Sequence, residues 1–218
     1  MNLFSFNSWL SRFLYLVADI VLFHVLWIIF SLPVVTIGAS TTALYYCCMK
    51  RIRRDEGYIT RNFLQAFKSN FKQSTLIWLL ILLVGAILFT DLRIGMAAGG
   101  VMGRFMLISC SILLIPFLCT VLYIFPVQAK FENRIIDNLK NAFLMSLSNF
   151  LFTLLLVFII ATFVLLTLTF PPFIGLMMIS GIGIYAYLTS GIYVYVFRKY
   201  IPDELEEDAQ AAKIDQEY

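Results

Sequence analysis

Apolar residues gather in five runs along the chain, separated by shorter and more polar stretches. The runs cover residues 15–35, 75–92, 106–128, 149–169 and 173–197. Each is close to the roughly 20 residues that a helix needs to cross the hydrocarbon core of a bilayer. The pattern predicts an all-α, polytopic membrane protein with about five transmembrane helices, arranged as a single integral membrane domain over residues 1–218.

The last part of the chain is expected to hold two of these helices. No charged residue occurs between Lys140 and Arg198, and a helix that rises about 1.5 Å per residue cannot fit such a run into one crossing. Pro171 and Pro172 interrupt the run, and they favour a turn because they lack backbone donors. We therefore expect a tight helical hairpin at this point.

Basic residues predict the orientation, because Lys and Arg near the ends of spans are preferentially kept in the cytoplasm. Thirteen of the 16 basic residues lie in segments 38–74, 129–148 and 198–218, and the other three are Arg12, Arg93 and Arg104. These three segments are therefore predicted to be cytoplasmic, with the N-terminus outside and the C-terminus inside. The cluster from Lys50 to Arg54 either binds anionic lipid headgroups or serves only to set the topology.

Composition supports the membrane assignment and narrows the chemistry. The chain is 61% hydrophobic and 13% charged, against about 45–50% and about 25% in ordinary soluble domains. The four cysteines have neither metal-ligand spacing nor a disulfide framework, so no metal or other cofactor is expected. Nucleic acid is not an expected partner, because no nucleic-acid-binding motif accompanies the basic residues.

The first two predicted cytoplasmic segments resemble each other weakly. The matched positions are Phe63, Ala66 and Phe67 with Leu139, Ala142 and Phe143 at an offset of 76, and 69–71 with 148–150 at an offset of 79. In the first segment the apolar positions recur on one helical face. The pattern indicates either a parallel internal repeat, in which each unit contains two spans joined by a cytoplasmic amphipathic helix, or chance similarity between apolar sequences.

Asp19 and His24 are the ionisable residues within the first apolar run. A charged group at the centre of a bilayer costs about 2.5–3.5 kcal/mol on insertion scales, which makes each a functional candidate. Five residues separate the two by about 140° around a helix, so they are not expected to share one site. The alternative is structural: Asp19 reaches water near the outer end of the span, and His24 bonds a carbonyl or hydroxyl of a neighbouring span.

The first run ends in a predicted helix break that contains further candidates. Pro33 ends the helix and Gly38 permits a sharp turn, with Thr36 between them. The stretch suits a helix that bends onto the cytoplasmic surface. Breaks of this kind coordinate ions in some transporters, and most others are plain structural turns.

No catalytic constellation is visible in the sequence. A single histidine excludes the H-E-x-x-H zinc motif, and neither the G-x-S-x-G elbow nor the P-loop occurs. The chain is therefore not expected to be an enzyme.

Four motifs lie in the first third of the chain: SLPVVTIGA at 31–39, ALYY at 43–46, Glu56-Gly57, and FxxxFKxNFKQ at 63–73. With these motifs the chain resembles the YesL-like family of bacterial multi-pass membrane proteins. The resemblance adds Glu56, Phe67 and Asn70 to the candidate residues. His24 stands where we expect this family to favour Asn.

The resemblance implies no established molecular activity. It implies a place in the bacterial cell membrane and gene neighbours for carbohydrate uptake and polysaccharide degradation. We therefore expect a non-enzymatic accessory protein that supports a sugar importer, with the cytoplasmic amphipathic helices contacting importer subunits or a second copy of the chain. The alternative is a small solute transporter or permease that acts as an oligomer and uses Asp19 and the first and third spans.

Overall fold

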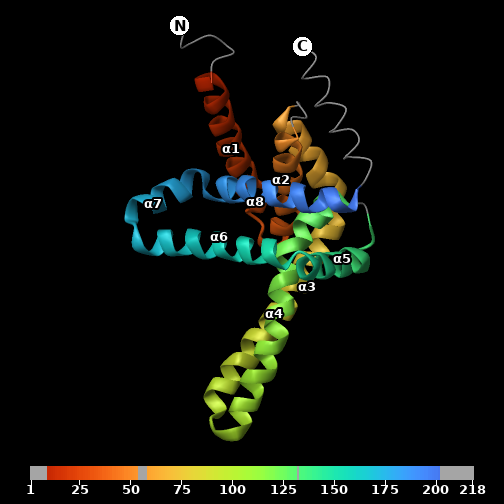
Figure 1. Ribbon diagram of the computed structural model, residues 1–218, viewed down its shortest axis with the longest axis vertical. Helices are drawn as coiled ribbons and strands as arrows, with labels where there is room; N and C mark the ends of the chain where they lie inside the picture. Colours follow the sequence, from red (N-terminus) through yellow and green to blue (C-terminus); the bar gives the residue numbers. More distant parts are fainter. Residues whose placement is uncertain (1–8, 54–57, 132, 202–218) are drawn as a thin grey trace.

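The computed structural model describes residues 9–53, 58–131 and 133–201 (Figure 1). Its helices are α1 (Trp9–Ser31), α2 (Ile37–Ile52), α3 (Ile59–Ala98), α4 (Gly100–Lys130), α5 (Ile135–Ser148), α6 (Phe150–Thr169), α7 (Pro171–Leu176) and α8 (Ile182–Phe197). Short 3₁₀ turns lie at Val34–Thr36 and Arg198–Tyr200, and a π-helical turn at Met177–Gly181 joins α7 to α8. No strand occurs in the described ranges, so the prediction of an all-α chain is confirmed.

Five helical segments in the described part of the chain are long and apolar enough to cross a membrane. They are Phe13–Ser31, Ile59–Ala98, Gly100–Lys130, Phe150–Thr169 and Pro171–Tyr200. Many of their large apolar side chains are exposed, for example Leu83, Phe105, Leu151 and Leu168. Lipid is the solvent that such surfaces require, so the structure supports a multi-pass membrane protein.

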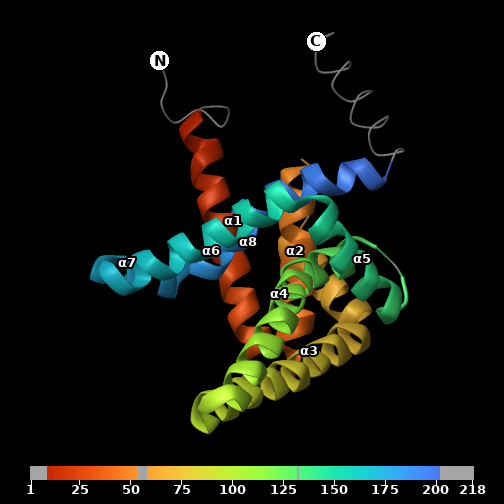
Figure 2. The same cartoon turned by 60° about the horizontal axis from the view of Figure 1, so that its bottom comes forward.

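α2 occupies the centre of the body. The sequence predicted a helix that bends onto the cytoplasmic surface of the membrane. α2 packs against α1, α3, α4 and α8 (Figure 2), and ten of its 16 residues are buried. Small residues permit this close packing. A Cβ atom on Gly38 would overlap the carbonyl oxygen of Ser74 and lie 2.6 Å from Cβ of Trp78. α2 is therefore packed by protein because its small residues fit a crowded interior, and its predicted place at the cytoplasmic surface of the membrane stays a prediction.

α2 also runs back along α1. Pro33 precedes the 3₁₀ turn, and Trp27 Nε1 donates to Thr41 Oγ1 across the α1–α2 pair at 3.1 Å. The end of α2 thereby returns to the middle of α1, where Arg51 meets Asp19. The start of the basic cluster lies beside α1 and not beyond its C-terminal end.

α3 joins an amphipathic half and an apolar half in one unbroken helix of 40 residues, about 60 Å long at 1.5 Å per residue. It turns into α4 at Gly99 and Gly100, which both have φ of 58°, a conformation that glycine adopts without a Cβ clash. Gly95 and Gly103 let the two helices approach closely. α4 continues as one helix through Pro116 and Pro126.

The other hairpin follows α5. Asn149, with φ of −117° and ψ of 49°, separates α5 from α6, and the chain turns back where Pro171 and Pro172 open α7. Figure 1 shows the α3–α4 hairpin extending to the bottom of the view and the α6–α8 hairpin to the left.

One local similarity links the two segments of the predicted repeat. The side-chain amides of Asn70 and Asn149 each donate to a carbonyl four residues earlier, on Ala66 and Met145, at 3.1 Å in both cases. The helices around them differ, because α3 continues past Asn70 whereas α5 ends next to Asn149. The duplication itself stays a prediction.

Candidate functional site

The amphipathic first half of α3 (residues 59–74) is the part of the body where polar side chains meet open grooves. Its inner face is closed by Phe63 and Ala66, which are buried in the core. Its outer face carries Arg61, Gln65 and Lys68, which are exposed. Because the inner face is held by packing, the outer polar face has a fixed position.

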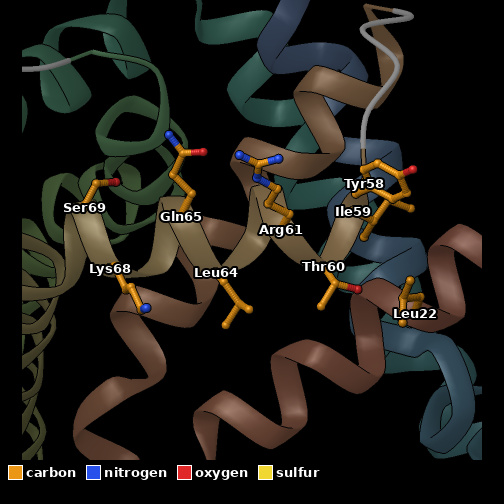
Figure 3. Close-up of a pocket in the computed structure, with 9 residues that line it drawn as sticks. All are labelled: Leu22, Tyr58, Ile59, Thr60, Arg61, Leu64, Gln65, Lys68 and Ser69. Atoms are coloured by element: carbon orange, nitrogen blue, oxygen red, sulfur yellow. The ribbon is translucent and has the colours of Figure 1, made fainter.

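One groove lies between the start of α3 and α1, and we call it the α1-side groove (Figure 3). It has a volume of about 1070 Å³ and is lined by Leu22, Tyr58, Ile59, Thr60, Arg61, Leu64, Gln65, Lys68 and Ser69. Figure 3 shows Thr60, Leu64 and Lys68 projecting from one side of α3 and Arg61, Gln65 and Ser69 from the other. This groove offers an apolar floor with cationic edges.

A second groove lies between the end of this half-helix, α2 and the end of α4, and we call it the α4-side groove. Its volume is about 800 Å³. It is lined by Tyr46, Gln65, Ala66, Lys68, Ser69, Asn70, Phe71, Lys72, Gln73, Gln128, Ala129, Lys130 and Asn133. The lining is rich in amides and lysines, so this groove suits a polar or anionic group.

A network of side-chain amides forms the base of the α4-side groove. Gln128 Nε2 donates to Gln73 Oε1 at 2.7 Å and to Asn70 Oδ1 at 3.1 Å. Asn138 Nδ2, on α5, donates to Gln128 Oε1 at 2.6 Å. Gln128 is only 3% exposed and Asn138 is fully buried. Burying amides is costly unless they are paired, so this network fixes the relative positions of α3, α4 and α5.

Asn70 is the predicted candidate that belongs to this network, whereas Phe67 belongs to the packing beside it. The Phe67 ring lies 4.9 Å from that of Phe30 and 5.4 Å from that of Phe71, measured between centroids. Such contacts add to packing. Phe67 therefore holds α3 against α1 in this structure.

The candidates at the helix break act as structural elements in this fold. Thr36 Oγ1 donates to the carbonyl oxygens of Phe30 at 2.6 Å and Pro33 at 2.7 Å, which closes the turn after α1. Trp78 Nε1 donates to Val34 O at 2.8 Å and ties that turn to α3. The carbonyls of Pro33 and Val34 are thus hydrogen-bonded within the protein, and Gly38 provides close packing.

Asp19 forms an ion pair with Arg51, whereas the structural interpretation of the sequence had its side chain reach water. Arg51 Nε lies 2.6 Å from Asp19 Oδ2, and the two side chains are 35% and 21% exposed respectively. Both residues are partly accessible, so solvent weakens the pair. The interaction fastens the end of α2 to α1.

His24 is buried and hydrogen-bonded to a backbone carbonyl of another element, which is the structural one of its two interpretations. Its Nε2 lies 3.0 Å from Met178 O in the π-helical turn. A carbonyl only accepts, so Nε2 carries the hydrogen in this contact. His24 Nδ1 is buried and has no hydrogen-bond partner within the described ranges. Asp19 and His24 thus contact different elements, as their spacing predicted.

Burial also sets the chemistry of the α2 thiols. Burial raises the pKa of Cys47 to about 12, with a smaller opposing effect of Lys50, and it raises the pKa of Cys48 as well. Thiolate is the nucleophilic form of cysteine, so these side chains behave as apolar packing groups at neutral pH. Glu56 lies outside the described residues. Within the described ranges, no group of His, Cys, Asp and Glu side chains is arranged to hold a metal ion.

Several site residues were missed by sequence reasoning. The hydropathy pattern places Gln128 in an apolar span, although it is a lone amide between Val127 and Ala129 and just before Lys130. That isolated polar residue was a usable signal. Gln73 and Asn138 gave none, because an amide in an amphipathic helix does not reveal its partner.

Comparison with known proteins finds a family likeness but no activity. A family described as "Protein of unknown function, DUF624" matches residues 20–92. "Uncharacterized protein YesL" of Bacillus subtilis (strain 168) is 28% identical over 155 residues, which are 69% of each chain. No solved structure matches the chain. The two matches confirm the resemblance to a YesL-like family of unknown function.

Proposed function

We propose that this YesL-like protein is a non-enzymatic accessory component of the bacterial cell membrane that assists carbohydrate uptake. The observation that carries the proposal is the first half of α3, whose outer face is polar, cationic and bordered by two grooves. The proposed partner is a membrane subunit of a sugar importer. Support for carbohydrate as the transported substrate comes from the gene neighbourhood that the family resemblance implies.

The proposed contact surface is the α1-side groove with the exposed side chains around it. Its floor is apolar and contains Leu22 and Leu64, while Arg61 stands at its edge. Protein interfaces combine an apolar centre with a polar rim, and arginine is enriched in them. A helix or loop of an importer subunit with acidic residues would match this arrangement.

Co-purification from the native membrane tests this function. The proposal expects importer subunits to co-purify with the full chain, and an Arg61→Glu/Leu64→Asp variant to lose them while keeping the same melting temperature in detergent. A matched control, Leu151→Asn on the exposed face of α6, should retain them. Absence of any partner, together with unchanged growth on sugars after gene deletion, would contradict the proposal.

The orientation in the membrane forms part of this proposal. We place the basic segments, including Lys50 to Arg54, in the cytoplasm. Because Arg51 at the end of α2 pairs with Asp19 in the middle of α1, we propose that the N-terminus lies on the same side as these basic residues, inside the cell, in place of the predicted outside location. A topology reporter fused before Met1 tests this revision. Cytoplasmic activity supports it, and activity on the outer side restores the original prediction.

A small solute transporter is the second candidate, and one observation favours it. The π-helical turn Met177–Gly181 packs against α1 next to the buried His24, and π-helical turns often occur at functional sites. Flux of a solute into liposomes, lost on His24→Ala or Asp19→Asn without loss of folding, would favour transport. Liposomes without flux would leave the accessory function as the better explanation.

A further inference from the structure

The α4-side groove concentrates positive charge beside a buried amide network. Lys68, Lys72 and Lys130 line it, and no acidic side chain is among its described lining residues. We propose that this groove binds the phosphate of an anionic phospholipid headgroup. The inference does not rest on the partner proposed above: the two grooves share Gln65, Lys68 and Ser69, but the lipid is assigned to the part formed with Lys72, Gln73 and the end of α4.

The amide network leaves some hydrogen-bond donors of the groove available to a ligand. Gln128 donates to the side-chain oxygens of Asn70 and Gln73, so those two acceptors are occupied. The amide hydrogens of Gln73 and the ammonium groups of Lys68 and Lys72 are then the groups that can bind a ligand. Phosphate oxygens accept hydrogen bonds and carry negative charge, so they complement this set.

The depth of the groove favours a lipid over a free anion. α3 passes from amphipathic to apolar sequence after Ser74, and α4 ends at Lys130, so the groove lies at the level where both apolar spans end. Headgroups lie at this level of a bilayer, and basic residues near span ends attract anionic ones.

An apolar surface for the acyl chains continues from the groove along α3. Leu76, Leu79 and Leu83 follow Lys72 at i+4, i+7 and i+11, which places all four on one helical face. These leucines are 54%, 43% and 63% exposed. A phospholipid uses both the charged groove and this stripe, whereas inorganic phosphate uses the groove alone.

Lipid binding is measured on the full chain in detergent, with phosphatidylglycerol and phosphatidylcholine as probes and native mass spectrometry as the readout. We expect preferential binding of phosphatidylglycerol. Lys68→Gln/Lys72→Gln should weaken it about 30-fold, since each near-surface lysine contributes roughly fivefold. The matched control is Lys140→Gln, an exposed lysine of α5 that does not line the groove, and it should bind normally.

Gln73→Glu gives a second and nearly isosteric test. The carboxylate still accepts the hydrogen bond from Gln128, so the melting temperature should change little, while the lost donor and added negative charge should abolish the lipid preference. Equal binding of both lipids, an equal loss in Lys140→Gln, or unchanged binding in Gln73→Glu would overturn the proposal. Displacement of phosphatidylglycerol by millimolar inorganic phosphate would also overturn it, because it would identify a free anion as the ligand.

Discussion

α2 and α6 show opposite relations between apolarity and burial. α2 contains hydroxyl residues and ends in a basic cluster, yet ten of its 16 residues are buried. α6 is apolar almost throughout, yet Thr153 and Leu156 are the only two buried residues among its 20. In a soluble protein the more apolar helix would be the buried one. Here lipid solvates α6, whereas α2 is buried because its small and hydroxyl side chains pack and bond with protein.

This contrast leaves the first half of α3 as a third kind of surface. It is polar like α2, and its outer face is exposed like α6. This polar surface is not covered by protein, and it is not suited to contact with lipid tails. It is therefore available for lipid headgroups or for a protein partner. The proposals for function and for lipid binding both follow from this property.

The largest expected effect comes from removing a core side chain of α2. Leu44 is 1% exposed, whereas Leu151 of α6 is 79% exposed. Leu44→Ala should lower the free energy of unfolding by about 2–5 kcal/mol through the cavity it leaves, and Leu151→Ala by less than about 0.5 kcal/mol. Thermal or denaturant unfolding in detergent measures both. Equal losses would mean that α2 is not the core helix.

A smaller but still clear effect is expected from adding a methyl group to α2. Gly38→Ala places Cβ against the Ser74 carbonyl and Trp78, and overpacking of this kind typically costs about 1–3 kcal/mol. Gly191 of α8 has no atom within 4 Å of the same position, so Gly191→Ala should be neutral or stabilising. A Gly38→Ala protein that melts like the parent would show that α2 and α3 are not in close contact.

Removal of one interhelical hydrogen bond should have a more modest effect. Thr42 Oγ1 and Ser74 Oγ are 2.9 Å apart and both residues are fully buried. Thr42→Val should cost about 1 kcal/mol. Thr162 of α6 donates to Phe158 O of its own helix, so Thr162→Val is the matched control with almost no expected change in the free energy of unfolding. A reversed order of the two effects would break the contrast between α2 and α6.

The reactivity of the Cys47 thiol tests the burial of α2 by a measurement that does not depend on a change in stability. Burial raises the pKa of Cys47 from 9.0 to about 12, so its thiolate fraction near pH 8 falls about a thousandfold and alkylation of the folded protein should be very slow. The rate should increase about tenfold per pH unit up to the pH at which the protein unfolds. An introduced Ser69→Cys on the exposed face of α3 should react fast and level off above about pH 9. Rapid labelling of Cys47 at pH 8 would contradict its burial.

The five apolar helices could be predicted because a bilayer demands long apolar runs, and no tertiary information enters that rule. The burial of α2 could not be predicted in this way. It depends on a match between Gly38 and the backbone of Ser74, which only the folded structure shows. Asn70 was found through its motif, whereas Gln128 was missed because its three amide partners lie on α3 and α5.

Site-specific photo-crosslinking in living cells tests the central claim most directly. A photoreactive residue is placed at Gln65, on the outer face of α3, and in a parallel strain at Leu154, an exposed residue of α6. The account predicts that Gln65 crosslinks to a membrane subunit of a sugar importer and that Leu154 gives no protein adduct. Crosslinks from Leu154 alone, or none from Gln65, would contradict the claim that the first half of α3 is the partner surface.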